Sequence, residues 1–187
     1  MGKIKKLVKK IISSYCSKRL HLPKGTIIYS TKNVHNLSCG QHCWVGTKNS
    51  FLVNVSLGDF SYTTKDSSLY GLKVGKFSCL GPGIAVIAGE HPTHDFVSVH
   101  PAFYSLAKQC GFTLVNKQKF EEYRFAEEGY NFTIGNDVWV GSHVLLIEGH
   151  SIGDGAIVAA GSVVTKNITP LRNLGRCTGA FHPETFH

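Results

Sequence analysis

Residues 134–166 read IGNDVWVGSHVLLIEGHSIGDGAIVAAGSVVTK and carry an aliphatic side chain at every sixth position. The aliphatic series is Ile134, Val140, Leu146, Ile152, Val158 and Val164. Ile, Leu and Val make up only 43 of the 187 residues, so six matches in succession rarely arise by chance. The period therefore indicates a structure built from stacked repeats of six residues.

Each hexad supplies one short strand and one tight turn, and three hexads complete a triangular coil. The aliphatic residue points into the prism, and a compact residue four positions later fills the corner; these residues are Val138, Val144, Ala156 and Ser162, with His150 as the exception. One coil cannot bury its apolar face alone, so coils stack around a continuous core. The pattern predicts an all-β fold, a parallel β-helix, in which the glycine after the aliphatic residue permits the backbone conformation of the turn.

Fainter repeats precede this block. One six-residue frame runs through Ile27, Asn33, Cys39, Val45, Phe51 and Leu57, and a second runs through Val74, Leu80 and Val86. The frames are 17 residues apart, one short of three hexads, so we expect a bulge or loop near residues 63–71. The repeat stops over residues 91–132. Loops of this length inside compact domains are usually functional, and we expect this loop excursion to reach a neighbouring subunit.

The two ends of the chain depart from the repeat. Residues 3–19 place apolar side chains at helical spacing among lysines, which predicts a short amphipathic helix within an N-terminal segment of residues 1–25. This helix either packs on the β-helix domain of residues 26–169 or makes a peripheral contact with an anionic membrane surface. Residues 170–187 show neither the hexad nor a helical period.

Composition narrows the classes of function. The formal net charge is +8, but five of the 20 Lys and Arg lie in the first ten residues, so we expect no nucleic-acid partner. No apolar run approaches the roughly 18–20 residues of a membrane span. The six cysteines follow no disulfide framework, which favours reduced thiols in a cytoplasmic protein. Cys39, His42 and Cys43 suggest a metal clip, but no second ligand pair follows at zinc-finger spacing.

Four motifs resemble one family. GEHPT at residues 89–93, SVHPAFY at 98–104, NDVWVG at 136–141 and AGSVVTK at 160–166 resemble the hexapeptide-repeat O-acetyltransferases. The chain is most similar to the branch related to chloramphenicol and streptogramin (xenobiotic) acetyltransferases, many of whose members modify polysaccharide sugars. The resemblance covers residues 27–169. It implies a left-handed β-helix, acetyl-CoA as co-substrate without a metal, and a homotrimer with sites at subunit boundaries.

The resemblance implies that His91, in the His-Pro pair that opens the excursion, is a general base. A histidine with an unperturbed pKa of about 6.5 can take the proton of an attacking hydroxyl, so no covalent nucleophile is required. His94 is the rival base, and either Glu90 or Asp95 would orient the ring. Glu90, His94 and Trp139 are expected to line the acceptor site, although Trp139 fits equally well as a buried packing residue.

The resemblance places acetyl-CoA on Gly141, Ser142, Ala160, Thr165 and Lys166. Small residues let the pantetheine arm approach the backbone, whose N–H and C=O groups can bond its amides. The Ser142 N–H is the expected oxyanion donor, and Lys166 is expected to meet the nucleotide phosphates. The alternative for each residue is an ordinary corner of the repeat or, for Lys166, a solvated side chain.

These assignments predict direct acetyl transfer to a sugar hydroxyl of a surface polysaccharide or its precursor. An aromatic pocket in the excursion would instead indicate acetylation of an antibiotic of the chloramphenicol or streptogramin type. Convergence of His91, His94 and His143 at a subunit boundary would indicate a metal-dependent hydratase, although their spacing does not match that class. A non-catalytic scaffold is the remaining alternative.

After Pro170 the resemblance ends. The family usually continues with Tyr, then Gly-Gly-x-Pro-Ala-Lys and a basic helix, whereas this chain continues LRNLGRCTGAFHPETFH. Codons for residues 170–186 exist from which deletion of one nucleotide yields a tail of the family's kind, so we hypothesise that residues 171–187 are frameshifted. The DNA sequence across Pro170 tests this, and codons incompatible with that frame relation contradict it.

Overall fold

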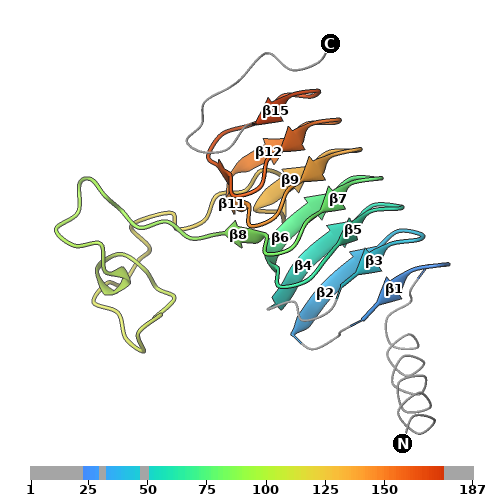
Figure 1. Cartoon of the computed structure of the whole chain (residues 1–187). Coiled ribbons are helices and arrows are strands. Elements are labelled where there is room, and N and C mark those ends of the chain that lie inside the picture. The colour runs from blue at the N-terminus through green and yellow to red at the C-terminus, as the bar shows by residue number, and fades with distance from the viewer. Residues whose placement is uncertain (1–22, 30–32, 47–50, 175–187) are drawn as a thin grey trace, which may run out of the picture.

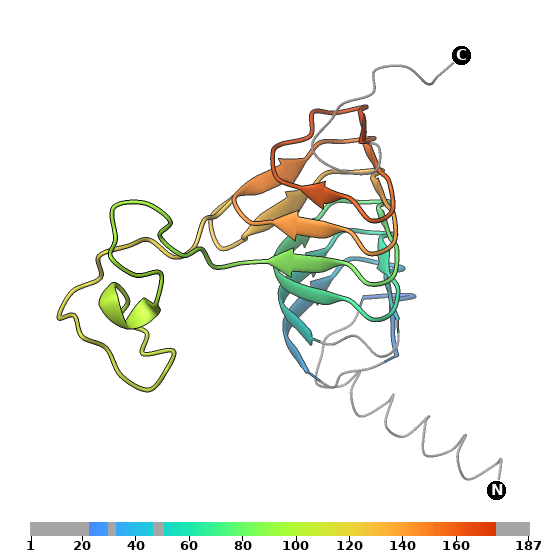
Figure 2. The same ribbon diagram turned by 60° about the vertical axis from the view of Figure 1, so that its left-hand side comes forward.

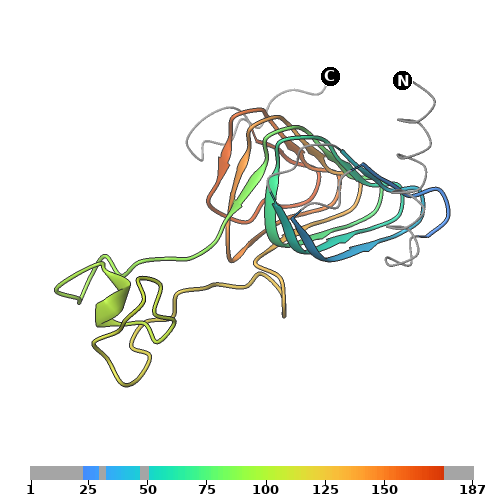
Figure 3. The same cartoon turned by 90° about the horizontal axis from the view of Figure 1, so that it is seen from below.

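A three-sided prism of stacked parallel coils forms the body of the protein, and one long excursion projects from its side (Figures 1 and 2). The computed structural model describes residues 23–29, 33–46 and 51–174, so the helix expected over residues 3–19 and the tail of residues 175–187 lie outside it. Seen from below, the coils share one triangular outline (Figure 3). No helix in the described ranges has the length and apolar character of a membrane span. The architecture is the predicted all-β parallel β-helix, consistent with the left-handed form.

Short strands alternate with turns along the prism, and the strand pairs are parallel. The strands are β1 (Ile27–Ile28), β2 (Val34–Cys39), β3 (Trp44–Val45), β4 (Phe51–Leu57), β5 (Tyr62–Thr63), β6 (Ser68–Val74), β7 (Cys79–Leu80), β8 (Ala85–Ile87), β9 (Phe132–Ile134), β10 (Trp139–Val140), β11 (Leu145–Ile147), β12 (His150–Ile152), β13 (Ile157–Val158), β14 (Val163–Val164) and β15 (Asn173–Leu174). A 3-10 turn, η1 (Pro101–Phe103), lies in the excursion.

Two sheets supply the three faces. One face is a seven-stranded sheet with the order β1-β3-β5-β7-β10-β13-β15. An eight-stranded sheet covers the other two faces, because β6 turns a corner without interruption. Ser68 of β6 pairs with Ala85 of β8 on one face, whereas Leu72 of the same strand pairs with Phe132 of β9 on the other.

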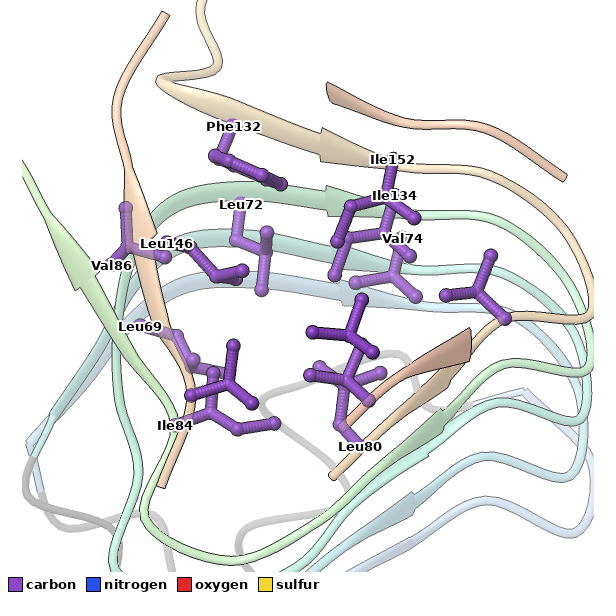
Figure 4. Packing of buried hydrophobic residues seen from close by; sticks show 14 of the residues in the cluster. Leu69, Leu72, Val74, Leu80, Ile84, Val86, Phe132, Ile134, Leu146 and Ile152 are labelled. Carbon is purple, nitrogen blue, oxygen red and sulfur yellow. The ribbon is translucent and has the colours of Figure 1, made fainter. Parts of the chain in front are cut away.

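The aliphatic ladder from Ile134 to Val164 points into the prism, as predicted. Each of its six side chains is at most 3 % exposed. The strand register stacks them in columns, with Val140 paired to Val158 and Leu146 to Val164. Figure 4 shows side chains from all three faces converging on one interior. Since burying an aliphatic side chain of this size contributes about 1.5–3 kcal/mol, these columns are the main source of the prism's stability.

The frame expected for the first coils is wrong by one residue at three of its six positions. The exposed residues are Ile27, Asn33 and Phe51, and the residue that follows each of them, Ile28, Val34 or Leu52, packs in the core instead. The other three frame residues, Cys39, Val45 and Leu57, belong to the core cluster or pack against it. The period is therefore correct in the first coils, but its phase changes within them.

A corner inside the long strands causes the phase change. Leu69 and Val74, both core residues of β6, are five residues apart rather than six, and β4 has the same spacing. Between them the strand bends at Gly71, whose φ is +56°. The slip expected near residues 63–71 therefore lies in a bend of a continuous strand rather than in a loop.

The glycine after the aliphatic residue has a different purpose from the one expected. Gly141 and Gly153 do not have positive φ; the left-handed conformation falls two residues later, as at His143 with φ +56°. A Cβ on Gly141 would lie 2.5 Å from the backbone nitrogen of Ala160 in the next coil, and one on Gly153 would lie 2.6 Å from that of Pro170. Glycine is needed here because one coil's backbone packs directly against the next.

The excursion leaves the prism after β8 and returns at β9, so it spans residues 88–131, close to the expected 91–132. Its regular structure consists of η1 and an isolated bridge between Glu127 and Tyr130. At the other end of the described chain, β15 pairs with β13. The residues just after Pro170 therefore extend the seven-stranded face.

Substitution of Leu146 by Ala tests the inner column. Leu146 is fully buried, so Leu146→Ala should lower the free energy of unfolding by about 2–5 kcal/mol, measured by denaturant unfolding. The matched control is Leu145→Ala, since this neighbouring leucine is 36 % exposed on the outer side and should cost less than about 1 kcal/mol. Equal losses in the two variants would contradict an inward ladder.

Candidate active site

His91 lies near the start of the excursion with its ring exposed to solvent and one ring nitrogen held. Its Nδ1 is 2.9 Å from the Val99 carbonyl oxygen and 2.7 Å from the Tyr104 hydroxyl. A carbonyl oxygen can only accept a hydrogen bond, so these partners assign the proton to Nδ1. In the neutral ring Nε2 is then an unprotonated nitrogen that can accept a proton.

Tyr104 anchors this histidine in a small aromatic core. Its ring is fully buried and packs edge-on against Phe96 and Phe120, with centroid distances of 6.0 and 5.5 Å. Burial, and secondarily the Glu122 carboxylate, raises the pKa of Tyr104, so its hydroxyl stays protonated at neutral pH. The excursion thus has an interior of its own that fixes the position of the hydroxyl beside His91.

The residues expected to orient His91 lie elsewhere. Glu90 forms an ion pair with Arg124 at 2.8 Å, and His94 and Asp95 are exposed. The ring is held instead by Val99 and Tyr104, which the sequence did not predict as its partners. These contacts span eight and thirteen residues in a segment without periodicity, so spacing gave no signal for them.

A hollow of about 520 Å³ lies on the flank of the prism where β10 and β13 reach a corner. Small residues form much of its lining, including Gly141, Ser142 and Ala160, three of the five residues expected to hold acetyl-CoA. Trp139 lines the hollow as well and is 58 % exposed, which places it in the groove rather than in the core. Gly81 supplies the facing backbone from the coil before.

The remaining expected residues do not line this hollow. Thr165 and Lys166 are exposed and follow β14 at the next turn of the prism. His91 lies on the excursion and is not part of the lining either. Within one chain the structure therefore groups Gly141, Ser142, Ala160 and Trp139, and keeps His91 apart from them.

The other histidines have structural contacts. The His143 ring lies over Gly83 at a corner, where a Cβ on that glycine would be 2.4 Å from Nδ1. His100 accepts the Ala102 N–H and so caps η1. His150 has Nδ1 2.8 Å from the Glu148 carbonyl oxygen. No group of three His, Cys, Asp or Glu side chains arranged to hold a metal ion occurs among the described residues.

Sequence similarity joins this geometry to known proteins. A family described as hexapeptide repeat of succinyl-transferase matches residues 132–166. The chain is 28 % identical over 138 residues to galactoside O-acetyltransferase of Escherichia coli K12, covering 70 % of this chain and 55 % of that protein. It is 29 % identical over 120 residues to chloramphenicol acetyltransferase of Agrobacterium fabrum, covering 61 % and 52 %. The chain is therefore similar to hexapeptide-repeat acetyltransferases.

One solved structure has a similar fold. A mutant of AntD, an N-acyltransferase from Bacillus cereus in complex with dTDP and coenzyme A, matches with a TM-score of 0.56 at 17 % identity, covering 86 % of this chain and 82 % of that one. At this identity the likeness concerns the fold alone. The chain spans about half the length of the curated relatives it matches.

The ring geometry predicts the tautomer of His91. Because the Val99 carbonyl oxygen must receive a proton, the neutral ring should be protonated on Nδ1 and not on Nε2. Nitrogen–proton correlation spectra of protein with labelled histidine, assigned by the loss of one signal in His91→Gln, measure this directly. A neutral His91 protonated on Nε2 would contradict the geometry.

Proposed function

We propose that the chain is an acetyl-CoA-dependent O-acetyltransferase that acts on a sugar hydroxyl of a surface polysaccharide or its precursor. The observation that carries the proposal is the exposed His91, whose Nδ1 is held by Val99 and Tyr104, which leaves Nε2 as the acceptor. An exposed histidine held in this way is suited to accept a proton from a hydroxyl group.

The hollow on the prism fits the pantetheine arm of acetyl-CoA. Its small lining residues leave backbone groups open to a chain-like ligand, and a Cβ on Gly141 would enter the space between the coils. Trp139 adds an exposed apolar surface at the same place. We assign Gly141, Ser142 and Ala160 to the pantetheine arm. Thr165 and Lys166, which follow β14 at the next corner around the prism, are assigned to the nucleotide end.

His91 performs the proton transfers. Acetyl-CoA supplies the activated acetyl group as a thioester when it is bound. The Nε2 of His91 takes the proton of the sugar hydroxyl as that oxygen attacks, and it returns the proton to the departing sulfur. Contacts from Val99 and Tyr104 keep the ring in place. The Ser142 N–H is the proposed donor to the carbonyl oxygen on which negative charge develops.

A homotrimer would bring the two halves of this site together. The excursion stands away from its own prism (Figure 2), and several of its apolar side chains are exposed, including Val97 at 99 % and Leu114 at 64 %. Exposed apolar surfaces of this kind mark sites of protein contact. We propose that the excursion packs on a neighbouring copy, so that His91 of one chain faces the hollow of another.

The names of the relatives support a hydroxyl group as the acceptor. They suggest two classes of acceptor, a sugar and an antibiotic. One is named a galactoside O-acetyltransferase and others are named chloramphenicol acetyltransferases. Exposed aromatic side chains on the excursion, such as Phe103, Phe112 and Phe125, would suit the antibiotic. We further propose a cytoplasmic location, which the free thiols of Cys39, Cys43, Cys79 and Cys110 suit.

Removal of the imidazole tests the base. His91→Ala should lower kcat by at least about 10² on any accepted sugar or on chloramphenicol, because proton transfer contributes that much to such reactions. Thiol release from acetyl-CoA, measured over a panel of both acceptor classes, reports the rate. His35→Ala, at an exposed histidine of β2 in the prism, is the matched control and should stay within a few-fold of wild type. Equal turnover of His91→Ala and wild type would exclude this role.

Filling the hollow tests the co-substrate site. Ala160→Leu places a branched side chain in the hollow and should raise the Kd of acetyl-CoA by about tenfold or more, equivalent to about 1.4 kcal/mol. Calorimetric titration measures this change. Ala85→Leu adds the same atoms on β8, outside the lining, and should leave the Kd unchanged. Wild-type affinity in Ala160→Leu would place acetyl-CoA elsewhere.

A further inference from the structure

A buried carboxylate of the prism bonds to both ends of the excursion. Glu148 follows β11 and is 1 % exposed. Its Oε1 accepts a hydrogen bond of 2.9 Å from the Gly89 N–H, and its Oε2 accepts one of 3.0 Å from Asn131 Nδ2. Gly89 is the second residue of the excursion and Asn131 is the last, so one side chain joins the outgoing and returning segments.

Burial makes these two bonds costly to lose. A carboxylate removed from water must be satisfied by hydrogen bonds, and bonds to a charged acceptor are stronger than neutral ones. The backbone beneath the carboxylate is held as well, because the Glu148 N–H donates to the Ile87 carbonyl at 3.1 Å and its own carbonyl lies 2.8 Å from His150 Nδ1. The carboxylate is therefore a fixed point.

Further hydrogen bonds hold the segment that leads from Gly89 to His91. Gly89 is two residues before His91. Between them, the Glu90 N–H donates to the Glu122 carbonyl oxygen at 2.7 Å, and the Glu90 carboxylate pairs with Arg124 at 2.8 Å. Both contacts tie the outgoing segment to the returning one. Glu148 fastens these paired segments to the prism through a buried side chain that bonds to Gly89.

We propose that Glu148 is a positioning residue, which fixes where the excursion leaves the prism and thereby sets the place of His91 relative to the acetyl-CoA hollow. This inference rests on the proposed function. Glu148 is not among the residues that line the hollow, and its carboxylate bonds to Gly89 and Asn131 rather than to the His91 ring, so it acts through the Gly89 backbone. A shift of about 1 Å in a catalytic group can lower a rate by about 10²-fold.

The decisive variant is Glu148→Gln, which keeps the shape of the side chain. Both partners of the carboxylate are donors, so the amide can satisfy one of them but must turn its own NH₂ group toward the other. We expect kcat to fall by about 10- to 100-fold while the Kd of acetyl-CoA stays within about twofold, because the hollow is unchanged.

Asp59→Asn is the matched control. Asp59 also accepts a backbone N–H through its carboxylate, from Gln41 at 2.9 Å, but it lies in the turn after β4, and its partners Gln41 and Lys76 both belong to the prism rather than to residues 88–131. The same carboxylate-to-amide change there should leave kcat within about twofold. Equal losses of kcat in the two variants would overturn the proposal, since they would reflect general loosening of the prism.

Hydrogen exchange supplies a readout that needs no activity. In Glu148→Gln the Gly89 amide and the rest of residues 88–131 should exchange faster than in wild type, whereas the prism strands should not. Unchanged exchange, or wild-type kcat, in this variant overturns the proposal. If wild type transfers acetyl to no acceptor, the proposed function fails, and exchange alone then decides whether Glu148 anchors the excursion.

A second variant covers the case in which Glu148→Gln does not fold. Asn131→Ala removes the other bond of the same carboxylate from the returning segment. It should give the same pattern, a lower kcat with unchanged acetyl-CoA affinity and faster exchange over residues 88–131. Wild-type kcat and exchange in Asn131→Ala would overturn the proposal.

Discussion

Direct packing of one coil's backbone on the next is the constraint on which this structure depends. Neighbouring strands lie at the usual spacing of about 4.8 Å, and the turns must keep the same spacing. Gly141 shows how: its N–H donates to the Val158 carbonyl at 2.8 Å, and it has no Cβ to meet the backbone of Ala160. The aliphatic columns can fill the interior only because the coils are stacked this closely.

The same constraint leads to the candidate site. Glycine, serine and alanine at the corners allow the coils to stack, and on the outer flank they leave backbone exposed around a hollow. The repeat fixes the position of each side chain on the prism, so the prism itself offers no group that can extend away from its surface. The excursion supplies such a group, with an aromatic interior around Tyr104 that holds His91, and with Glu148 fastening its base to the prism.

Much of the fold could be predicted from the sequence because each hexad repeats the same physical requirement, a buried aliphatic side chain at every sixth position. The ladder from Ile134 to Val164 was predicted correctly, and so was the position of the excursion. The phase of the first coils was not, because the five-residue corner in β4 and β6 depends on a left-handed backbone at Asn54 and Gly71 that the period does not express.

The candidate site, too, could be predicted from the sequence only in part. Residues within the repeat, such as Gly141 and Ala160, could be placed in the hollow because the repeat fixes their location. Contacts within and below the excursion could not be placed. The hydrogen bond between Tyr104 and His91, and that between Glu148 and Gly89, join residues whose separation follows no rule of strand or helix.

The central claim is that His91 of one chain serves the hollow of another, and mixed oligomers test it most directly. His91→Ala chains keep an intact hollow, and Ala160→Leu chains keep the imidazole, so each is impaired alone. Unfolded and refolded together in equal amounts, and assayed at acetyl-CoA concentrations below the wild-type Kd, they should recover about a quarter of the wild-type acetyl-transfer rate, since random assembly pairs an intact base with an intact hollow at that frequency. A mixture no more active than the average of its two components would contradict the account.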